Sequence, residues 1–244
     1  MVVQISLGLD VFARGKEMNK IVLSAITLGV VASASAQSIF GGSNVIMNAG
    51  LDEGSPSAGG GVIAVPGWTG DAGVGTYGVA NWWEIPSGSW ATGTQFFHGG
   101  SNGSTQITQV KVLDAADLAT VDAGNAAYNL SGWFGGWQTQ NDTAALTMRM
   151  LDGGAAELGT VRIGDVTSTD RASVSGMLQR SASGTLLAGT RSLEFVLVAT
   201  RAGGTSNDGV ADTLSFTAEA VPEPATMLIV ASAAALSARK RRQK

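Results

Sequence analysis

The sequence predicts an all-β protein built as an antiparallel β-sandwich, and three observations support this class. Short runs alternate apolar and polar residues with a period of two, as strands with one buried face do. Glycine accounts for 34 of the 244 residues and is scattered among Ser, Thr and Asn, which suits many turns. Heptads and long helical periodicity are missing from the middle of the chain. Many short strands with turn residues between them favour a jelly roll, with a barrel as the alternative.

The alternation identifies several strands in chain order. Residues 128–132 place Tyr128 and Leu130 on one face, and residues 145–151 do the same with Leu146, Met148 and Met150. Asp152-Gly153-Gly154 is a turn signal that predicts a hairpin between 145–151 and 157–164.

Two further runs complete the predicted sandwich. Residues 193–197 alternate Leu193, Phe195 and Leu197 with polar or smaller neighbours. Residues 212–220 form the predicted last strand, and Asn207-Asp208-Gly209 predicts a turn just before it.

Composition limits the partners. Residues 37–220, about 180 residues, are enough for one sizeable domain. Between Gln37 and Val221 there are seven lysines and arginines against sixteen aspartates and glutamates. A surface this acidic repels phosphate backbones, so we expect no nucleic-acid partner. The chain has no cysteine, which excludes disulfides, thiolate catalysis and cysteine-based zinc sites.

The N-terminal region contains a signal for export. From Met18, Lys20 precedes a short apolar run, and Ala34 and Ala36 give the small-residue pattern that signal peptidase accepts. We therefore expect a signal peptide over 18–36, Sec export and cleavage before Gln37. Residues 1–17 read poorly as its beginning and are interpreted as an overextended start.

The C-terminal region, residues 221–244, has three parts. Pro222, Glu223 and Pro224 precede the apolar run 225–238, and the cluster Arg239, Lys240, Arg241 and Arg242 follows it. A helix of that run reaches roughly 21 Å, short of the ~30 Å hydrocarbon core. The basic cluster favours a cytoplasmic end, which predicts a transient stop in the inner membrane.

The order of these three parts resembles the PEP-CTERM sorting signal of Gram-negative and related bacteria. The resemblance covers about 24 residues, and the paired signal peptide fits the same family. It implies recognition by an exosortase, cleavage near Pro-Glu-Pro, and delivery of the body to the cell surface or extracellular matrix. A simple tail anchor that is never processed is the alternative.

The body also resembles a galactose-binding-like jelly roll of the family-4/9 carbohydrate-binding type. The resemblance rests on "SNVIMNAGLDEG" at 43–54, "PGWT" at 66–69 and "NDGVADTLSF" at 207–216. In that family an opening acidic residue and a closing aspartate often hold a structural Ca²⁺ where the first and last strands meet. Carried over by position, these residues are Asp52 and Asp212. Leu51-Asp52 stands where the family usually has Phe-Glu, and the alternative for both carboxylates is a solvated turn.

The aromatic residues indicate where a ligand would bind. Sugar rings stack their apolar faces on aromatic planes, while amides and carboxylates take the hydroxyls. The candidate ligand residues are Trp82, Trp83, Trp90, Trp133, Trp137, Gln138 and Asn141. Adjacent residues of a strand point to opposite faces, so at most one of Trp82 and Trp83 can share a given surface. Structural packing of these tryptophans is the alternative.

No residue pattern points to catalysis, and we expect no enzyme. His98 is the only histidine, and no Gly-x-Ser-x-Gly motif accompanies it. We interpret His98 as a rim or turn residue. The favoured function is an exported surface protein that binds glycan or exopolysaccharide. A structural or adhesive matrix protein without a small ligand is the alternative, and a secreted hydrolase ranks last.

Overall fold

A computed structural model describes residues 38–79 and 85–222 of the chain. The chain divides into two compact units, Met1–Ser33 and Ala34–Lys244, and every described residue belongs to the second. The predicted signal peptide with its Ala34–Gln37 cleavage site, and the tail from Glu223 onward with its basic cluster, lie outside the described residues. Within the described ranges, no helix is long and apolar enough to cross a membrane.

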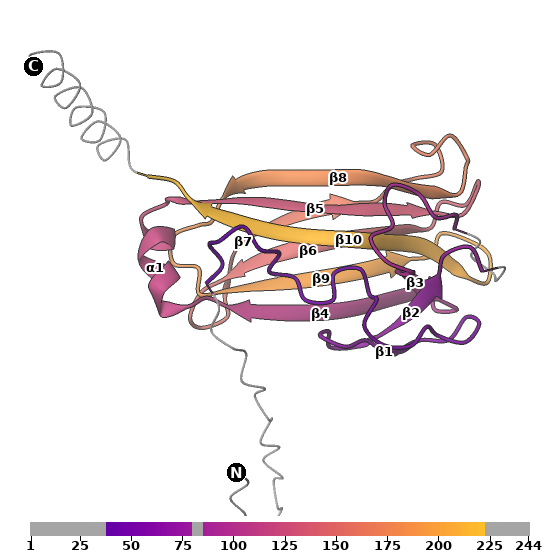
Figure 1. The fold of residues 1–244 in the computed structure, drawn as a ribbon, viewed down its shortest axis with the longest axis horizontal. Coiled ribbons are helices and arrows are strands. Elements are labelled where there is room, and N and C mark those ends of the chain that lie inside the picture. The colour runs from indigo at the N-terminus through magenta and orange to yellow at the C-terminus, as the bar shows by residue number, and fades with distance from the viewer. Residues whose placement is uncertain (1–37, 80–84, 223–244) are drawn as a thin grey trace, which may run out of the picture. The chain divides into compact units, whose positions relative to one another are not determined.

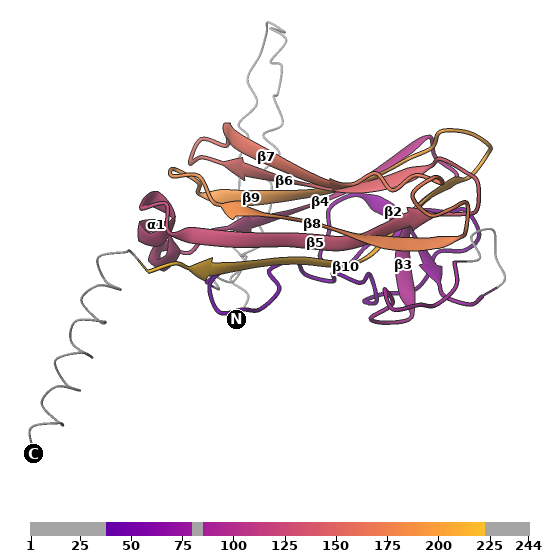
Figure 2. The same ribbon diagram turned by 90° about the horizontal axis from the view of Figure 1, so that it is seen from above.

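Two antiparallel sheets stack face to face, which confirms the predicted β-sandwich (Figures 1 and 2). The larger sheet contains, in spatial order, β1 (Ile63–Ala64), β2 (Asp71–Thr76), β3 (Gln95–Gly100), β10 (Asn207–Ala220), β5 (Ala126–Gly136) and β8 (Gly176–Thr185). The smaller sheet contains β4 (Ser104–Val112), β9 (Ser192–Thr200), β6 (Thr143–Leu151) and β7 (Glu157–Gly164). The finer jelly-roll assignment stays a prediction.

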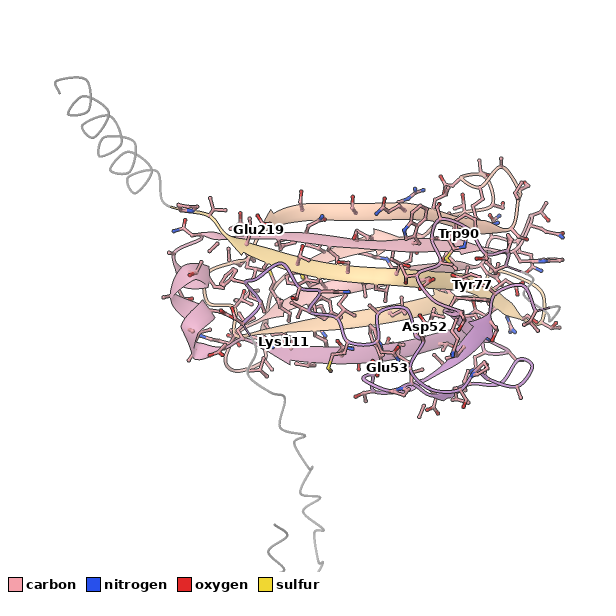
Figure 3. All side chains as sticks on the ribbon, viewed as in Figure 1. Asp52, Glu53, Tyr77, Trp90, Lys111 and Glu219 are labelled. Atoms are coloured by element: carbon pink, nitrogen blue, oxygen red, sulfur yellow. The ribbon has the colours of Figure 1, made fainter. Side chains whose placement is uncertain are left out.

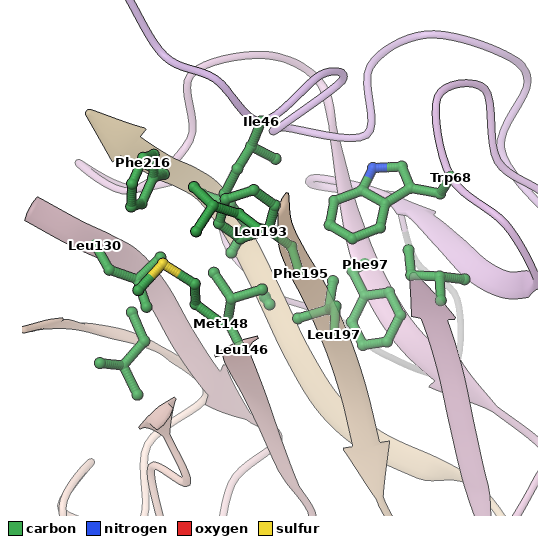
Figure 4. Packing of buried hydrophobic residues seen from close by; sticks show 14 of the residues in the cluster. Ile46, Trp68, Phe97, Leu130, Leu146, Met148, Leu193, Phe195, Leu197 and Phe216 are labelled. Carbon is green, nitrogen blue, oxygen red and sulfur yellow. The ribbon is translucent and has the colours of Figure 1, made fainter. Parts of the chain in front are cut away.

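The core lies between the sheets and follows the predicted alternation. Leu146 and Met148 of β6, Phe195 of β9 and Phe216 of β10 are fully buried, as Figure 4 shows. The rings of Phe195 and Phe216 lie 5.4 Å apart and join the two sheets. Trp68, from the segment that carries the family resemblance, is also buried in this core. The predicted strands over 128–132, 145–151, 157–164, 193–197 and 212–220 are confirmed.

The predicted hairpin is confirmed, because β6 and β7 pair antiparallel on either side of the turn. The Asp152 carboxylate accepts hydrogen bonds from the backbone N–H groups of Gly154 at 2.8 Å and Ala156 at 2.9 Å. An aspartate that bonds its own following backbone stabilises a tight turn without help from the rest of the fold.

The turn predicted at Asn207-Asp208-Gly209 is wrong, since these residues are buried and begin β10. A Cβ on Gly209 would lie 2.3 Å from the Thr143 carbonyl oxygen, so glycine here permits close approach of the two sheets. The buried Asp142 carboxylate accepts from the N–H of Asp208 at 2.8 Å and of Ala202 at 2.7 Å. The Asp142 carboxylate therefore satisfies backbone N–H groups near the point where the pairing of β10 with β3 shifts register.

The opening motif also differs from the expectation. Residues 43–54 form extended segments and turns rather than a regular strand. The extended part nonetheless lies beside β10, where Val45 N–H donates to Phe216 O at 2.9 Å. The Asn44 side chain donates to Leu214 O at 2.8 Å and accepts from Phe216 N–H at 2.9 Å. A side-chain amide here replaces part of the backbone ladder.

Among the described residues one helix, α1 (Ala115–Asp122), covers an end of the sandwich, and the sequence patterns above did not predict it (Figure 1). Asp114 caps its N-terminus by accepting from Ala116 N–H at 3.2 Å. Asp117 is buried and accepts from the Ser38 hydroxyl at 2.6 Å and from Ile39 N–H at 2.9 Å. The helix therefore anchors the first described residues of the chain.

Candidate functional site

Aromatic side chains gather on the outer face of the larger sheet, away from the core. Phe97 and Phe134 point into the core, so by alternation Phe96 and Trp133 point outward. The rings of Trp90 and Trp133 lie 6.2 Å apart. We call this group the outer aromatic cluster, and its members are Tyr77, Ile85, Trp90, Phe96, Trp133, Met177 and Val210.

The structure brings together only some of the predicted ligand residues. Trp90 and Trp133 are half-buried partners, and the Trp90 indole N–H is buried with no hydrogen-bond acceptor among the described residues. Trp137, also half-buried, lies one residue beyond the end of β5. Trp82 and Trp83 lie outside the described residues.

Gln138 and Asn141 have separate environments. Gln138 is exposed, has a positive φ of 41°, and is not a member of the outer aromatic cluster. Its backbone N–H donates to the Ser175 hydroxyl at 3.1 Å. The Asn141 side-chain oxygen accepts from the hydroxyl of Ser168 at 2.7 Å and from its N–H at 3.1 Å, which ties two loops together.

A hollow of about 640 Å³ borders the outer aromatic cluster through Ile85. Its walls are formed by Gly78, Val79, Ile85, Pro86, Gln138, Ser173, Val174 and Ser175. Val79 and Val174 are largely exposed there, at 49% and 63%. The hollow therefore offers a mixed apolar and hydroxyl surface beside the tryptophan pair, of a volume typical of small-ligand sites.

A row of small polar side chains continues from Trp133 along the same outer face. The register pairs Ser131 of β5 with Ser215 of β10 and Ser181 of β8, and pairs Asn129 with Thr217 and Ser183. Directly opposite residues share a face, so all six side chains point outward beside Gln179, the partner of Trp133. We call Asn129, Ser131, Gln179, Ser181, Ser183, Ser215 and Thr217 the polar row.

The side chains of the polar row are open to solvent. Asn129, Gln179, Ser181 and Ser183 are exposed, and the others are half-buried. Among the described residues, none of these side chains has a hydrogen-bond partner, so their hydroxyl and amide groups face water. The sequence carried this signal as the polar half of the alternation at 127–133, but only the register shows that three strands align it.

The two predicted metal-ligand residues lie close together beside Tyr77 of the outer aromatic cluster, and Asp52 is exposed there. Figure 3 shows Asp52 and Tyr77 at the same end of the sandwich as Trp90. The Tyr77 hydroxyl donates to Asp212 at 2.7 Å, while Asp52 accepts from the N–H groups of Thr94 at 2.7 Å and Gln95 at 3.0 Å. Asp212 is fully buried.

Burial raises the pKa of Asp212 and of its hydrogen-bond partner Tyr77. Removal from water, and to a smaller extent the Asp52 carboxylate, raises the pKa of Asp212 to about 7, although hydrogen bonds from Tyr77 and Thr213 act in the opposite direction. Burial, followed by the Asp212 carboxylate, also raises the pKa of Tyr77. A buried carboxylate beside a second one lacks a compensating positive charge from these neighbours.

The same oxygens fit a hard cation. A Cβ built on Gly50 would lie 2.7 Å from an Asp52 oxygen, 3.3 Å from an Asp212 oxygen and 3.4 Å from the Thr92 hydroxyl. Glycine thus leaves a space lined by two carboxylates and a hydroxyl, which are the oxygen donors that Ca²⁺ prefers. Among the described residues, no three acidic, histidine or cysteine side chains group as a metal site, so carbonyls or water would complete the coordination.

His98 is not at a rim or turn, and that interpretation is wrong. It is 1% exposed within β3 and packs near Phe96, with ring centroids 6.2 Å apart. Burial lowers the pKa of His98 to about 3, so the ring is neutral at physiological pH. Glycine at position 73 makes room for the ring, because a Cβ there would lie 2.1 Å from it.

Two hydrogen bonds of His98 with described residues fix the tautomer of its ring. Nδ1 accepts from Gly100 N–H at 3.0 Å, so in the neutral ring Nε2 carries the proton. Nε2 lies 3.5 Å from the Ser57 hydroxyl and can only donate to it. In this tautomer His98 cannot remove a proton from Ser57, which is the step that a serine hydrolase requires.

Comparisons with known proteins give no family. No protein-family model matches the chain, and no curated protein matches it. Among solved structures, the enzymatically active domain of bacteriophage CBA120 tailspike protein 4 matches at 11% identity and TM-score 0.41, over 63% of this chain and 19% of that one. This chain therefore spans about a fifth of the tailspike domain.

Two smaller structures match along nearly their whole length. The Stig cyclase Fisc from Fischerella sp. TAU has 17% identity and TM-score 0.46, over 73% of this chain and 98% of that one. A "Family 16 Carbohydrate Binding Module-2" has 18% identity and TM-score 0.41, over 71% and 99%. All three TM-scores lie below 0.5, so the function of this chain must be inferred from its own residues.

Proposed function

We propose that this chain is a non-catalytic, exported β-sandwich that binds a glycan on the outer face of its larger sheet. The observation that carries the proposal is the polar row, which begins beside the Trp90–Trp133 pair and whose hydroxyl and amide groups have no partner among the described residues. Aromatic rings take the apolar faces of a sugar, and neighbouring hydroxyls and amides exchange hydrogen bonds with its hydroxyls.

The chemistry of the polar row favours an uncharged polysaccharide. All seven of its members are neutral, and the surrounding body is acidic. An acidic glycan would meet repulsion from this body without a compensating cation in the row. A neutral chain would find donors and acceptors along the β8, β5 and β10 strands, with a stacking surface at one end.

The experiment is binding of the protein to arrays of neutral and acidic polysaccharides, with the Trp133→Ala variant beside Val196→Ala as a control. Val196 lies on the outer face of the smaller sheet, in β9. We expect Trp133→Ala to weaken binding at least about tenfold, since a stacked ring contributes more than a kilocalorie per mole. Val196→Ala should bind normally. No binding to any polysaccharide would instead favour a structural or adhesive matrix protein.

The chain ends support a route to the cell surface. The signal peptide at 18–36 would direct Sec export and cleavage by signal peptidase, and the PEP-CTERM-like tail would pause in the inner membrane for an exosortase. The mature body would then reside at the cell surface or in the extracellular matrix. Mass spectrometry of the mature protein tests this, because an intact Lys244 would exclude processing near Pro222 and leave a simple tail anchor.

A structural Ca²⁺ held by Asp52 and Asp212 belongs to the same proposal. The ion would supply the positive charge that the buried Asp212 carboxylate lacks and would join the 48–54 segment to β10. Calorimetric melting with and without a chelator tests this at fixed pH. An unchanged melting temperature would remove the metal from the proposal without affecting the glycan site.

A further inference from the structure

The sandwich has four edge strands, and three of them are short, covered or charged. β1 has only two residues. In β4, Thr108 exchanges two backbone hydrogen bonds with Thr69, at 2.7 and 2.8 Å, so part of that edge is covered. β7 carries Glu157 and Arg162, and its pairing with β6 contains a register shift. Charges, bulges and coverage are the usual protection of an edge against pairing with another strand.

The fourth edge, β8, has almost none of this protection. Its ten residues pair with β5 in one uninterrupted register from Ala127↔Thr185 to Gly136↔Gly176. Figure 1 shows β8 at the margin of the larger sheet, with no described strand beyond it. Half of the backbone groups of an edge strand point away from its neighbour. Among the described residues, only one of these outward groups has a partner, the Gln179 carbonyl, which accepts from the Arg180 side chain at 3.2 Å.

The side chains of β8 also permit a close approach. Residues 181–184 read Ser-Ala-Ser-Gly, and Ser181, Ser183 and Gly184 are exposed. The strand contains no aspartate or glutamate, although the body as a whole is strongly acidic. Arg180 is its only charged residue and already lies 3.6 Å from Asp170. β8 is thus the long edge at which two acidic copies of the chain would repel each other least.

We propose that β8 pairs antiparallel with β8 of a second copy of this chain, about a two-fold axis near Ala182. In such a pair, a residue that precedes the axis by a given number of positions faces the residue that follows it by the same number in the other copy. An axis at Ala182 therefore sets Arg180 of one copy opposite Gly184 of the other, and Ser181 opposite Ser183. An axis at Ser181 sets Arg180 opposite Ala182. In both registers the two arginines avoid each other, and small or hydroxyl side chains meet across the interface.

The pairing joins the two larger sheets into one continuous sheet. The outer faces coincide under this symmetry, so the polar rows of both copies lie side by side on one surface. The dimer does not depend on glycan binding, because the interface is made by backbone groups that the polar row does not use.

The absence of cysteine from the chain gives a direct test. Five variants each carry a single cysteine, in place of Gln179, Ser181, Ala182, Ser183 or Thr185. Each full-length variant is then oxidised under identical conditions, in the same detergent solution. A disulfide needs Cβ atoms about 3.5–4.5 Å apart, which only a residue at the axis satisfies against its own copy. We expect cross-linked dimer to peak at Ser181→Cys or Ala182→Cys and to be at least about tenfold lower at Thr185→Cys.

Thr160→Cys is the matched control, since Thr160 is an exposed residue of β7, an edge strand that is protected by charged side chains and a register shift. It should not cross-link above the background of random collision. A flat profile along β8, or equal cross-linking at Thr160, would overturn the proposal.

Sedimentation velocity supplies the non-covalent test. The wild-type chain should form dimers as its concentration rises, and the double variant Ser181→Lys/Ser183→Lys should dissociate at least tenfold more readily. Both lysines point to solvent, so the melting temperature of the variant at low concentration should match the wild type. A wild-type chain that stays monomeric, or a dimer that the lysines leave intact, would contradict pairing through β8.

Discussion

The two outer faces of this sandwich are built from the same alternating pattern but treat their polar groups differently. On the smaller sheet, Arg149 forms ion pairs with Glu157 at 2.6 Å and with Glu194, and Arg162 pairs with Asp165 at 2.8 Å. On the larger sheet, the polar row is neutral, and its side chains have no hydrogen-bond partner within 38–79 and 85–222. The first face carries charged side chains that pair with each other, whereas the polar row carries neutral groups without such partners among the described residues.

Under the proposed function, this difference distinguishes the face that binds glycan from the face that only contacts solvent. Ion pairs at exposed positions contribute little to stability, and they occupy donors that a ligand would otherwise use. Hydroxyl and amide groups without partners cost little in water, yet they can exchange their water for a sugar hydroxyl. The availability of polar groups is therefore a better guide to the binding face than the number of them.

The largest expected effect concerns the core that both faces share. Phe195→Ala removes a fully buried ring between the sheets, and we expect the free energy of unfolding to fall by about 3–5 kcal/mol. Val196→Ala, at the next position but on the outer face, should cost about 1 kcal/mol or less. Denaturant unfolding measures both. Similar losses at the two positions would mean that the alternation assigned to β9 is wrong.

The next effect is a pH dependence at Asp212, the hydrogen-bond partner of Tyr77 in the outer aromatic cluster. The pKa of Asp212 is about 7 in the folded protein and 3.8 in the unfolded chain, so the folded state binds more protons between these values. The contribution of the protonated Asp212 carboxyl to the free energy of unfolding is then fully present below about pH 4, and it is lost as the pH rises to 7. In the presence of a chelator, this loss should be on the order of 3 to 4 kcal/mol.

Asp212→Asn should flatten this dependence, because the amide does not titrate. Chemical unfolding at a series of pH values, with chelator, compares the variant with the wild type. Added Ca²⁺ should oppose the slope in the wild type only, since a bound cation favours the ionised carboxylate. A wild-type chain whose stability is unchanged across this range without metal would contradict the buried, protonated Asp212.

A smaller effect tests the polar row itself. Asn129→Ala removes an exposed amide from β5, and we expect polysaccharide affinity to fall by about threefold to tenfold, the value of one or two hydrogen bonds. Thr147→Ala removes a hydroxyl from the outer face of the smaller sheet and should leave affinity unchanged. Isothermal titration with a polysaccharide from the array measures both. Equal losses would show that the two faces do not differ in binding.

The smallest effect belongs to the ion-paired face. Arg149→Met keeps the length and much of the apolar stem while it removes both ion pairs of this exposed guanidinium. We expect the melting temperature to move only slightly and polysaccharide binding to be unaffected. A large loss of stability would indicate that the charge network supports the smaller sheet more strongly than exposed pairs usually do.

Local patterns in the sequence predicted where strands lie better than they predicted where strands begin or where the two sheets approach each other closely. Leu146, Met148 and Phe195 alternate with polar neighbours, and alternation alone assigns them to the core. The segment Asn207-Asp208-Gly209 has the composition of a turn, but the fold uses Gly209 to bring the sheets together and Asp142 to satisfy the backbone. That partner is 66 residues away in sequence, so no local pattern could reveal it.

The site shows the same limit. Trp90 and Trp133 were candidates by residue type, but only the register of β5 with β8 and β10 shows that Asn129, Ser181 and Thr217 share a face with Trp133. The short helix α1 did carry a local signal, in its capping Asp114 and the following Gly124 with φ of 72°. Eight residues are too few to show a clear helical period, which is why the pattern missed it.

The anchoring of the chain by α1 gives the sandwich a polarity. Ser38 and Ile39 are held by Asp117, and Val221 N–H donates to the Asn125 carbonyl at 2.7 Å, just after the helix. Both limits of the described body therefore emerge from the same pole, while Trp90, Tyr77 and Asp52 lie at the opposite one (Figure 3). If either end of the chain were tethered, the end of the sandwich that carries Trp90 would lie farthest from the tether, separated from it by the long axis of the sandwich.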